Sequence, residues 1–235
     1  MAKKHQLRKL RAGTVINLAA NKMESSLGGV LVRLASKLRV SGLRLKHERQ
    51  WNLSTIVQNL QEHFPDVEFH CYFKNSSLRP DGGVLSIVDD AGLAYPILIS
   101  EVKNQGTNDL RREEGKPKQA KGNAIERLGK NVIGFRAAMR HELIFPFVCF
   151  GDGCDFADDS SILDRVSTIA IFSELRSVRV MNEGPDGVFN RGSFYFRERA
   201  WTEPEMLGVC SEIAERAIHY YFSKYGKDRF IAKEV

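Results

Sequence analysis

Apolar residues recur at helical spacing in three stretches of the chain. The first runs from about residue 25 to residue 63, the second from 122 to 142 and the third from 203 to 226. Side chains three and four positions apart share one face of an α-helix, so such a pattern is typical of an amphipathic helix packed on a core. We therefore expect mostly helical structure in these three stretches.

Between the helical stretches the pattern changes to short runs that are typical of β-strands. Residues 67–73 alternate between apolar and polar positions, and the runs 84–90 and 95–103 are separated by an Asp-Asp-Ala-Gly turn. The run 95–103 is apolar on both faces until Glu101, which places it in the middle of a sheet. Further short strands are predicted at 143–150, 167–172, 177–181 and 192–196.

Helices that flank a central mixed β-sheet make a single α/β domain. A chain of 235 residues with 43% hydrophobic and 27% charged residues is typical of an ordinary globular protein with a substantial core. No apolar run is long enough to span a bilayer. The four cysteines include no C-x-x-C pair, and free thiols favour a reducing compartment. We expect a cytoplasmic protein without a membrane partner.

Positive charge is concentrated at the beginning of the chain. Residues 1–50 contain twelve Lys or Arg residues against two acidic ones, Glu24 and Glu48, although the net charge of the whole chain is only +6. A basic segment on a mildly acidic body suggests contact with a polyanion such as nucleic acid, while a solvated face or a disordered tail is the plain alternative. We expect a basic, flexible arm over residues 1–22 and the folded domain over residues 23–235.

Three charged residues mark the hairpin between residues 81 and 103. Asp81 stands in the turn before its first strand, and Glu101 and Lys103 end its second strand on one face. Burying charge is expensive unless the charge is used or paired. Carboxylates of Asp81 and Glu101, with the main-chain carbonyl of Val102, are ligands that Mg²⁺ prefers, and Lys103 can hold an attacking water. The alternative is a hairpin that ends in a salt bridge.

Several motifs around this hairpin resemble the EcoRI family of type II restriction endonucleases, a branch of the PD-(D/E)xK nucleases. The motifs NSSLRPDGG, VDDAG, SEVKNQG, GNAIERLGKN and FPFVCF occur in the family's order, and the resemblance covers roughly residues 68–172. It implies a restriction-endonuclease-like fold and a nuclease that depends on Mg²⁺. By this resemblance Asp81, Glu101 and Lys103 are catalytic, with the metal at Asp81 and Glu101.

The resemblance also implies which residues read the DNA bases. The Gly-Asn-Ala-x-Glu-Arg stretch implies that the central AATT of a palindrome is read by four residues: Asn123, Ala124, Glu126 and Arg127. Asn can pair with both the N6 donor and the N7 acceptor of adenine, and Ala can contact a thymine methyl group. The alternative is that Asn123 and Glu126 form a helix-capping box. The two roles are compatible, because a helix that points at DNA can use both its end and its side chains.

Contacts to the DNA backbone are predicted around the same two motifs. Each phosphate contact adds to the salt dependence of DNA binding. The predicted backbone residues are Asn75, Ser77, Arg79, Gln105, Gly106, Lys121 and Lys130.

The chain departs from the family where the outer base pair is read. Of the family's Arg-x-x-Arg pair only Arg165 is present, because Thr168 stands at the second position. The site is therefore expected to be a short palindrome that contains AATT, or AATT itself. The resemblance further implies a homodimer on double-stranded DNA, cleavage that leaves 5′ overhangs, and a cognate methyltransferase. The alternatives are a structure-selective or repair nuclease of the same superfamily, and a DNA-binding regulator without catalysis.

Overall fold

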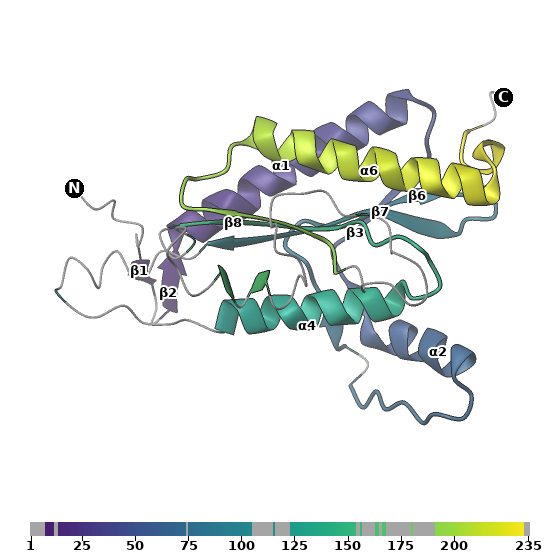
Figure 1. Ribbon diagram of the computed structural model, residues 1–235, viewed down its shortest axis with the longest axis horizontal. Helices are drawn as coiled ribbons and strands as arrows, with labels where there is room; N and C mark the ends of the chain where they lie inside the picture. Colours follow the sequence, from purple (N-terminus) through teal and green to yellow (C-terminus); the bar gives the residue numbers. More distant parts are fainter. Residues whose placement is uncertain are drawn as a thin grey trace.

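A mixed five-stranded sheet forms the centre of the protein, with helices on both of its faces (Figure 1). The computed structural model describes residues 8–11, 14–73, 75–104, 115, 123–153, 156, 163–164, 166–167, 180 and 191–232. The strands of the central sheet lie in the order β3 (Leu45–Glu48), β6 (Gly83–Val88), β7 (Ala94–Asn104), β8 (Phe147–Asp152) and β9 (Ser193–Arg197). This is the α/β fold with a central mixed sheet that the sequence predicts.

Strand β7 occupies the middle position, as its two apolar faces predict. It pairs antiparallel with β6 through the turn after Asp89 and parallel with β8 on its other side. Residues 97–102 are buried, because helices cover both faces of the strand. The charged end of β7 therefore lies beside the ends of β6 and β8 rather than at an open edge of the sheet.

The helices form one layer on each face of the sheet (Figure 1). Helices α1 (Leu18–Val40) and α6 (Glu203–Tyr225) contact each other and β7 on one face. Helices α2 (Leu53–His63) and α4 (Asn123–Ala138) contact each other on the opposite face. The 3-10 helix η2 (Lys227–Arg229) follows α6. The apolar sides of the predicted helices face the sheet, where Leu27, Leu34, Leu128, Val132 and Phe135 are 0–1% exposed.

Two small strand pairs lie outside the central sheet. Strand β1 (Arg8–Arg11) pairs with β2 (Thr14–Asn17), directly before α1, and β4 (Trp51–Asn52) pairs with β5 (Ser77–Leu78). Helix α1 begins at Leu18, so residues 18–22 of the expected arm lie in this helix. Among the described residues, no helix combines the length and the apolarity that crossing a bilayer requires.

Two local predictions differ from the structure. The region of residues 25–63 is mostly helical, as predicted, but between α1 and α2 it also contains the edge strand β3, which pairs with β6. Residues 67–73 were predicted as a strand, but they form neither a helix nor a strand, and Phe73 is 74% exposed. Their alternating pattern has no neighbouring strand to pair with among the described residues. The strands predicted at 167–172 and 177–181 lie largely outside the described residues.

Candidate active site

Asp81 is held in the tight turn that leads into β6. The amide of Gly82 donates to the Ser100 carbonyl at 2.9 Å, and the amide of Gly83 donates to the Pro80 carbonyl at 3.0 Å. Gly83 has a φ of +79°, and a Cβ at this position would lie 2.6 Å from the carbonyl oxygen of Glu48. Only glycine fits such a backbone beside a neighbouring strand. The turn therefore fixes Asp81 opposite the end of β7.

Asp81 is tied directly to the strand that carries the other two predicted catalytic residues. The amide of Val102 donates to Asp81 Oδ2 at 3.1 Å. Glu101 and Lys103 flank Val102 and point to one side of β7, because side chains alternate along a strand. One hydrogen bond and the strand period thus bring together three groups that are up to 22 positions apart in the chain.

Three oxygen atoms converge on the ammonium group of Lys103. Lys103 Nζ donates to Asp81 Oδ2 at 3.2 Å, to the carbonyl oxygen of Val102 at 3.0 Å, and to Glu101 Oε1. These oxygens belong to the three residues that the sequence nominates as metal ligands. The ammonium group of Lys103 therefore occupies a position where oxygen atoms of Asp81, Glu101 and Val102 surround a positive charge.

The three charged side chains of the site differ in how deeply they are buried, and burial affects their pKa values. The side chain of Glu101 is 3% exposed and that of Lys103 is 14% exposed, while the side chain of Asp81 reaches 26%. Desolvation raises the pKa of Glu101, although the charge of Lys103 opposes this effect. Burial acts to lower the pKa of Lys103, but Glu101 and the other nearby negative charges outweigh it and raise that pKa. Lys103 is therefore charged at neutral pH.

Glu101 has one oxygen in a network and one without a partner. Asn131 of helix α4 donates to Glu101 Oε1 at 3.2 Å, which joins the helix directly to the site. Glu101 Oε2 is buried and has no hydrogen-bond partner among the described residues. A buried carboxylate oxygen without a partner is costly, so this atom points to a ligand of the working site.

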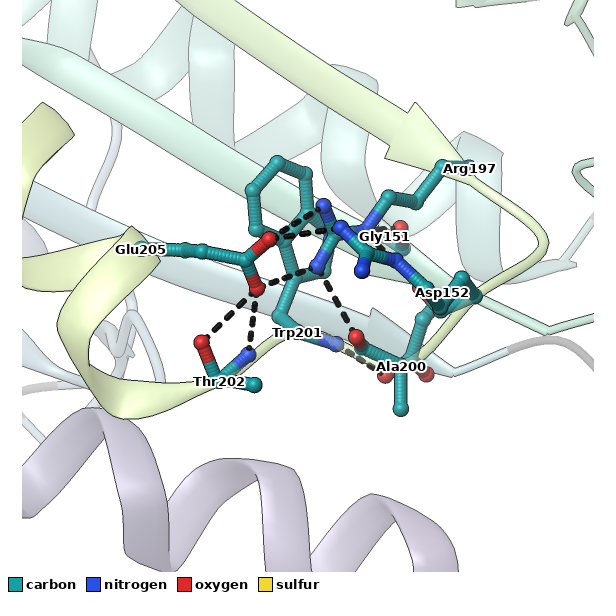
Figure 2. Close-up of polar contacts among 8 residues, drawn as sticks. Gly151, Asp152, Arg197, Ala200, Trp201, Thr202 and Glu205 are labelled. Atoms are coloured by element: carbon teal, nitrogen blue, oxygen red, sulfur yellow. Dashed lines mark hydrogen bonds and ion pairs between the residues drawn. The ribbon is translucent and has the colours of Figure 1, made fainter.

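The end of β7 is anchored immediately after Lys103. Asn104 Nδ2 donates to Asp152 Oδ1 at 2.6 Å, and the amide of Trp201 donates to Asp152 Oδ2 at 3.3 Å. Trp201 Nε1 also donates to the Gly151 carbonyl at 2.9 Å (Figure 2). The buried Asp152 thus links the end of β7 to the segment that leads into α6. This link positions the backbone that carries Lys103.

Beside Asp152, the start of α6 is fixed by a group of charged and capping residues that we call the α6 corner: Arg197, Arg199, Trp201, Thr202 and Glu205. Arg197 donates to both carboxylate oxygens of Glu205, at 2.9 and 2.6 Å, and its guanidinium lies 3.6 Å from the centroid of the Trp201 ring (Figure 2). Thr202 and Glu205 form a capping box. The α6 corner holds one helical layer against the ends of β8 and β9.

The predicted metal ligands fit a hydrated cation better than a cage made only of protein. Among the described residues, no three His, Cys, Asp or Glu side chains are grouped closely enough to hold a metal ion. Two carboxylates and a main-chain carbonyl leave room for water, and Mg²⁺ characteristically keeps several waters. The oxygen of Glu101 that lacks a partner is consistent with such an ion.

Those predicted DNA-contact residues that the structure describes lie along the first half of α4 and before the catalytic turn. Glu126, Arg127 and Lys130 are exposed on α4, whose position 131 reaches Glu101. Asn123 and Ala124 begin that helix, but their side chains are not among those described, so both roles of Asn123 stay predictions. Asn75 precedes β5, Ser77 lies within it, and Arg79 follows it. Outside the described residues lie Gln105, Gly106, Lys121 and Arg165.

Sequence reasoning missed Asn131 and Asp152. Asn131 lies three positions after the buried Leu128 of α4, and its amide alone carries no sign that it reaches a carboxylate. Asp152 is a charged residue at the end of a buried strand, as Glu101 is close to the end of β7. That position is the one feature of the sequence that could have singled out Asp152. Partners for both side chains come from distant parts of the chain.

Comparisons with known proteins show the family of the chain. The family model for restriction endonuclease EcoRI matches residues 11–161. The type II restriction enzyme RsrI of Cereibacter sphaeroides is 28% identical over 241 residues, covering 87% of this chain and 87% of that protein. The type II restriction enzyme EcoRI of Escherichia coli is 29% identical over 143 residues, covering 57% of this chain and 52% of that protein. The chain belongs to the EcoRI family of type II restriction endonucleases, which are site-specific deoxyribonucleases.

Proposed function

We propose that this endonuclease hydrolyses double-stranded DNA with Mg²⁺ bound at Asp81 and Glu101, within a short palindrome that contains AATT. The observation that supports this most directly is the convergence of Asp81, Glu101 and the Val102 carbonyl on one cationic group. A site that already holds an ammonium ion among three oxygens has the charge and the donors for a hydrated divalent cation.

Each residue of the site has a role in this proposal. Asp81, Glu101 and the Val102 carbonyl hold the cation, and Asn131 keeps the Glu101 carboxylate in place. When bound, the cation supplies Lewis acidity for the scissile phosphate and lowers the pKa of the attacking water. Lys103 is charged and lies within hydrogen-bonding reach of both carboxylates, so it can orient that water and balance negative charge in the transition state.

We further propose that α4 reads the bases. Glu126 and Arg127, with Lys130 as a backbone contact, are exposed near the start of a helix whose later part contacts Glu101. Base reading and cutting therefore lie on neighbouring parts of one surface. By the likeness of Gly122–Arg127 to the family's stretch, the bases read are AATT, with Arg165 near the outer pair. Cutting before the first base of AATT by each subunit of a homodimer leaves 5′ overhangs. A cognate methyltransferase would protect the host DNA in the cytoplasm.

Digestion of mixed-sequence DNA, followed by sequencing of the fragment ends, tests the function. We expect discrete fragments whose 5′ overhangs carry AATT, produced with Mg²⁺ and stopped by a chelator. A continuous smear would instead support a structure-selective or repair nuclease. The absence of cutting with any divalent ion would support a regulator that only binds DNA.

The variant Glu101→Gln tests the site itself. It keeps the shape of the side chain but removes the charge that holds the cation, so we expect cleavage to fall on the order of a hundredfold or more while DNA binding is retained. Glu215→Gln is the matched control, because Glu215 pairs with Lys37 on the exposed surface of α6 and α1. If Glu101→Gln cut DNA at the rate of the control, the proposed catalytic site would be wrong.

A further inference from the structure

The turn that carries Asp81 depends on its neighbours for a fixed shape. Asp81 is followed by Gly82 and Gly83, and glycine has more backbone freedom than any other residue. The amide of Gly82 donates to the backbone of β7 at 2.9 Å. A Cβ at Gly82 would lie 2.9 Å from Leu27 and 3.0 Å from Leu31, so helix α1 also packs on the turn. The carbonyl group of Gly82 still needs a donor.

The edge strand β3 supplies this donor through the side chain of His47. His47 Nε2 lies 2.8 Å from the carbonyl oxygen of Gly82. A carbonyl oxygen only accepts hydrogen bonds, so Nε2 carries the proton and donates. The paired positions of β3 and β6 end at Glu48 and Val84. Beyond the last pair, the contact from β3 to Gly82 therefore passes through a side chain.

The imidazole ring of His47 also lies against the second glycine of the turn. A Cβ on Gly83 would lie only 2.7 Å from His47 Nε2, so the ring uses space that the absence of a side chain leaves open. His47 itself is exposed on the outer strand of the sheet. The contact thus adds little buried apolar area, and its main effect is to fix the direction of one peptide group.

We propose that His47 is a positioning residue of the active site, which holds the Gly82 carbonyl and thereby sets the Asp81 carboxylate where it meets the divalent cation. The inference rests on the proposed function of that site. Asp81 has the most exposed side chain of the three charged residues there, at 26%. Its contacts to Val102 and Lys103 both use Oδ2, so the direction of Oδ1 depends on the backbone of the turn. Residues that orient a metal ligand affect both the affinity for the metal and the rate.

Two variants of His47 differ in whether they keep the donor. His47→Gln keeps an amide nitrogen as far along the side chain as Nε2, so it can still donate to Gly82. His47→Asn places its nitrogen at the position of Nδ1, too short to reach that carbonyl. His219→Asn is the matched control, because His219 is exposed on helix α6.

The test uses the full-length protein and two measurements of metal affinity. The first is binding of Mn²⁺ alone to the DNA-free protein by titration calorimetry, and the second is the Mg²⁺ concentration for half-maximal cleavage in a single turnover. We expect His47→Asn to weaken Mn²⁺ binding and to raise that Mg²⁺ concentration, each by about tenfold. His47→Gln and His219→Asn should behave as the wild type does. DNA binding without a divalent cation should be the same in all four proteins.

Thermal unfolding with a chelator present separates this role from a purely structural one. A structural role alone would lower the melting temperature of His47→Asn and leave the metal affinity of the folded protein unchanged. Wild-type metal affinity in His47→Asn would overturn the inference, and so would equal losses in His47→Asn and His47→Gln, because the ring rather than the donor would then matter. The proposed function stands in both cases if Glu101→Gln still abolishes cutting. A wild type that neither binds Mn²⁺ nor cuts DNA would overturn both.

Discussion

Two glycines at opposite ends of the β6–β7 hairpin show how the backbone holds the catalytic turn. Gly83 and Gly92 both have positive φ, +79° and +83°. A Cβ on Gly92 would meet nothing within 4 Å, whereas one on Gly83 would collide with the Glu48 carbonyl and the His47 ring. The backbone carbonyl cannot rotate away without disturbing the pairing of β3 with β6. The same backbone conformation thus occurs once in open space and once under close packing.

Gly83→Ala should therefore destabilise the protein more than Gly92→Ala. Strain at positive φ costs about 1 kcal/mol in both variants, and crowding adds about 1–3 kcal/mol only in Gly83→Ala. Denaturant unfolding of both variants measures the difference in free energy. DNA cleavage should also fall in Gly83→Ala, because Asp81 lies two residues away. Equal destabilisation of the two variants would show that the close approach of β3 is not a constraint.

At the residue scale, the sequence predicts the charged residues of the site but not the residues that position them. Glu101 and Lys103 can be predicted from the sequence because charge at the end of an apolar strand is expensive and therefore informative. Asp81 can be predicted because it stands in the turn before the strand that pairs with theirs. Asn131 carries no such signal, since an Asn within a helix is an ordinary residue. Its position beside Glu101 follows from the packing of α4 on the sheet, and residue spacing alone does not give that packing.

At the scale of elements, strands β6 and β7 and helices α4 and α6 follow closely from hydrophobic pattern, because each buries a continuous apolar face. The edge strand β3 does not, since only Leu45 among its four residues is apolar and its pairing depends on the backbone of β6. The alternation in residues 67–73 suggests a strand, but a strand also needs a neighbour to receive its hydrogen bonds. The hydrophobic pattern predicts which faces of helices and strands are buried, and it predicts which strands pair only indirectly.

The α6 corner predicts a dependence of stability on pH. Hydrogen bonds from Arg197, and then from the backbone and side chain of Thr202, hold the pKa of Glu205 well below its usual value of 4.5. A carboxyl whose folded pKa is depressed adds stability above its unfolded pKa, and this stability is lost as pH falls toward the folded value. Glu205→Gln should therefore cost about 1–2 kcal/mol at pH 7. It should also flatten the loss of stability below about pH 5.

Melting temperatures between pH 7 and pH 3 measure both effects of Glu205→Gln. Glu212→Gln is the control, because Glu212 makes an exposed pair with Arg216 one turn away on the same helix, and such pairs contribute little. A pH profile for Glu205→Gln that runs parallel to the wild-type profile would contradict the proposed source of the stability.

At the scale of the whole molecule, charge is separated along the chain. The first 50 residues are strongly basic, whereas the remainder is slightly acidic, so the body of the protein does not attract DNA by net charge alone. The described part of this basic segment runs from the β1–β2 pair through α1 to β3, and α1 packs beside the Asp81 turn. This placement brings the N-terminal region close to the end of the sheet where the proposed chemistry occurs.

We therefore expect the residues before α1 to strengthen DNA binding without choosing the site. Replacing the five basic residues of this segment with Gln keeps the chain length; they are Lys3, Lys4, Arg8, Lys9 and Arg11. Each phosphate contact contributes about 0.9 to the slope of log K against log salt, so the slope should become shallower by up to about 4.5. The sequenced cleavage sites should stay the same, because phosphate contacts carry no base information. An unchanged slope would show that the segment does not contact phosphates, and altered sites would show that it reads bases.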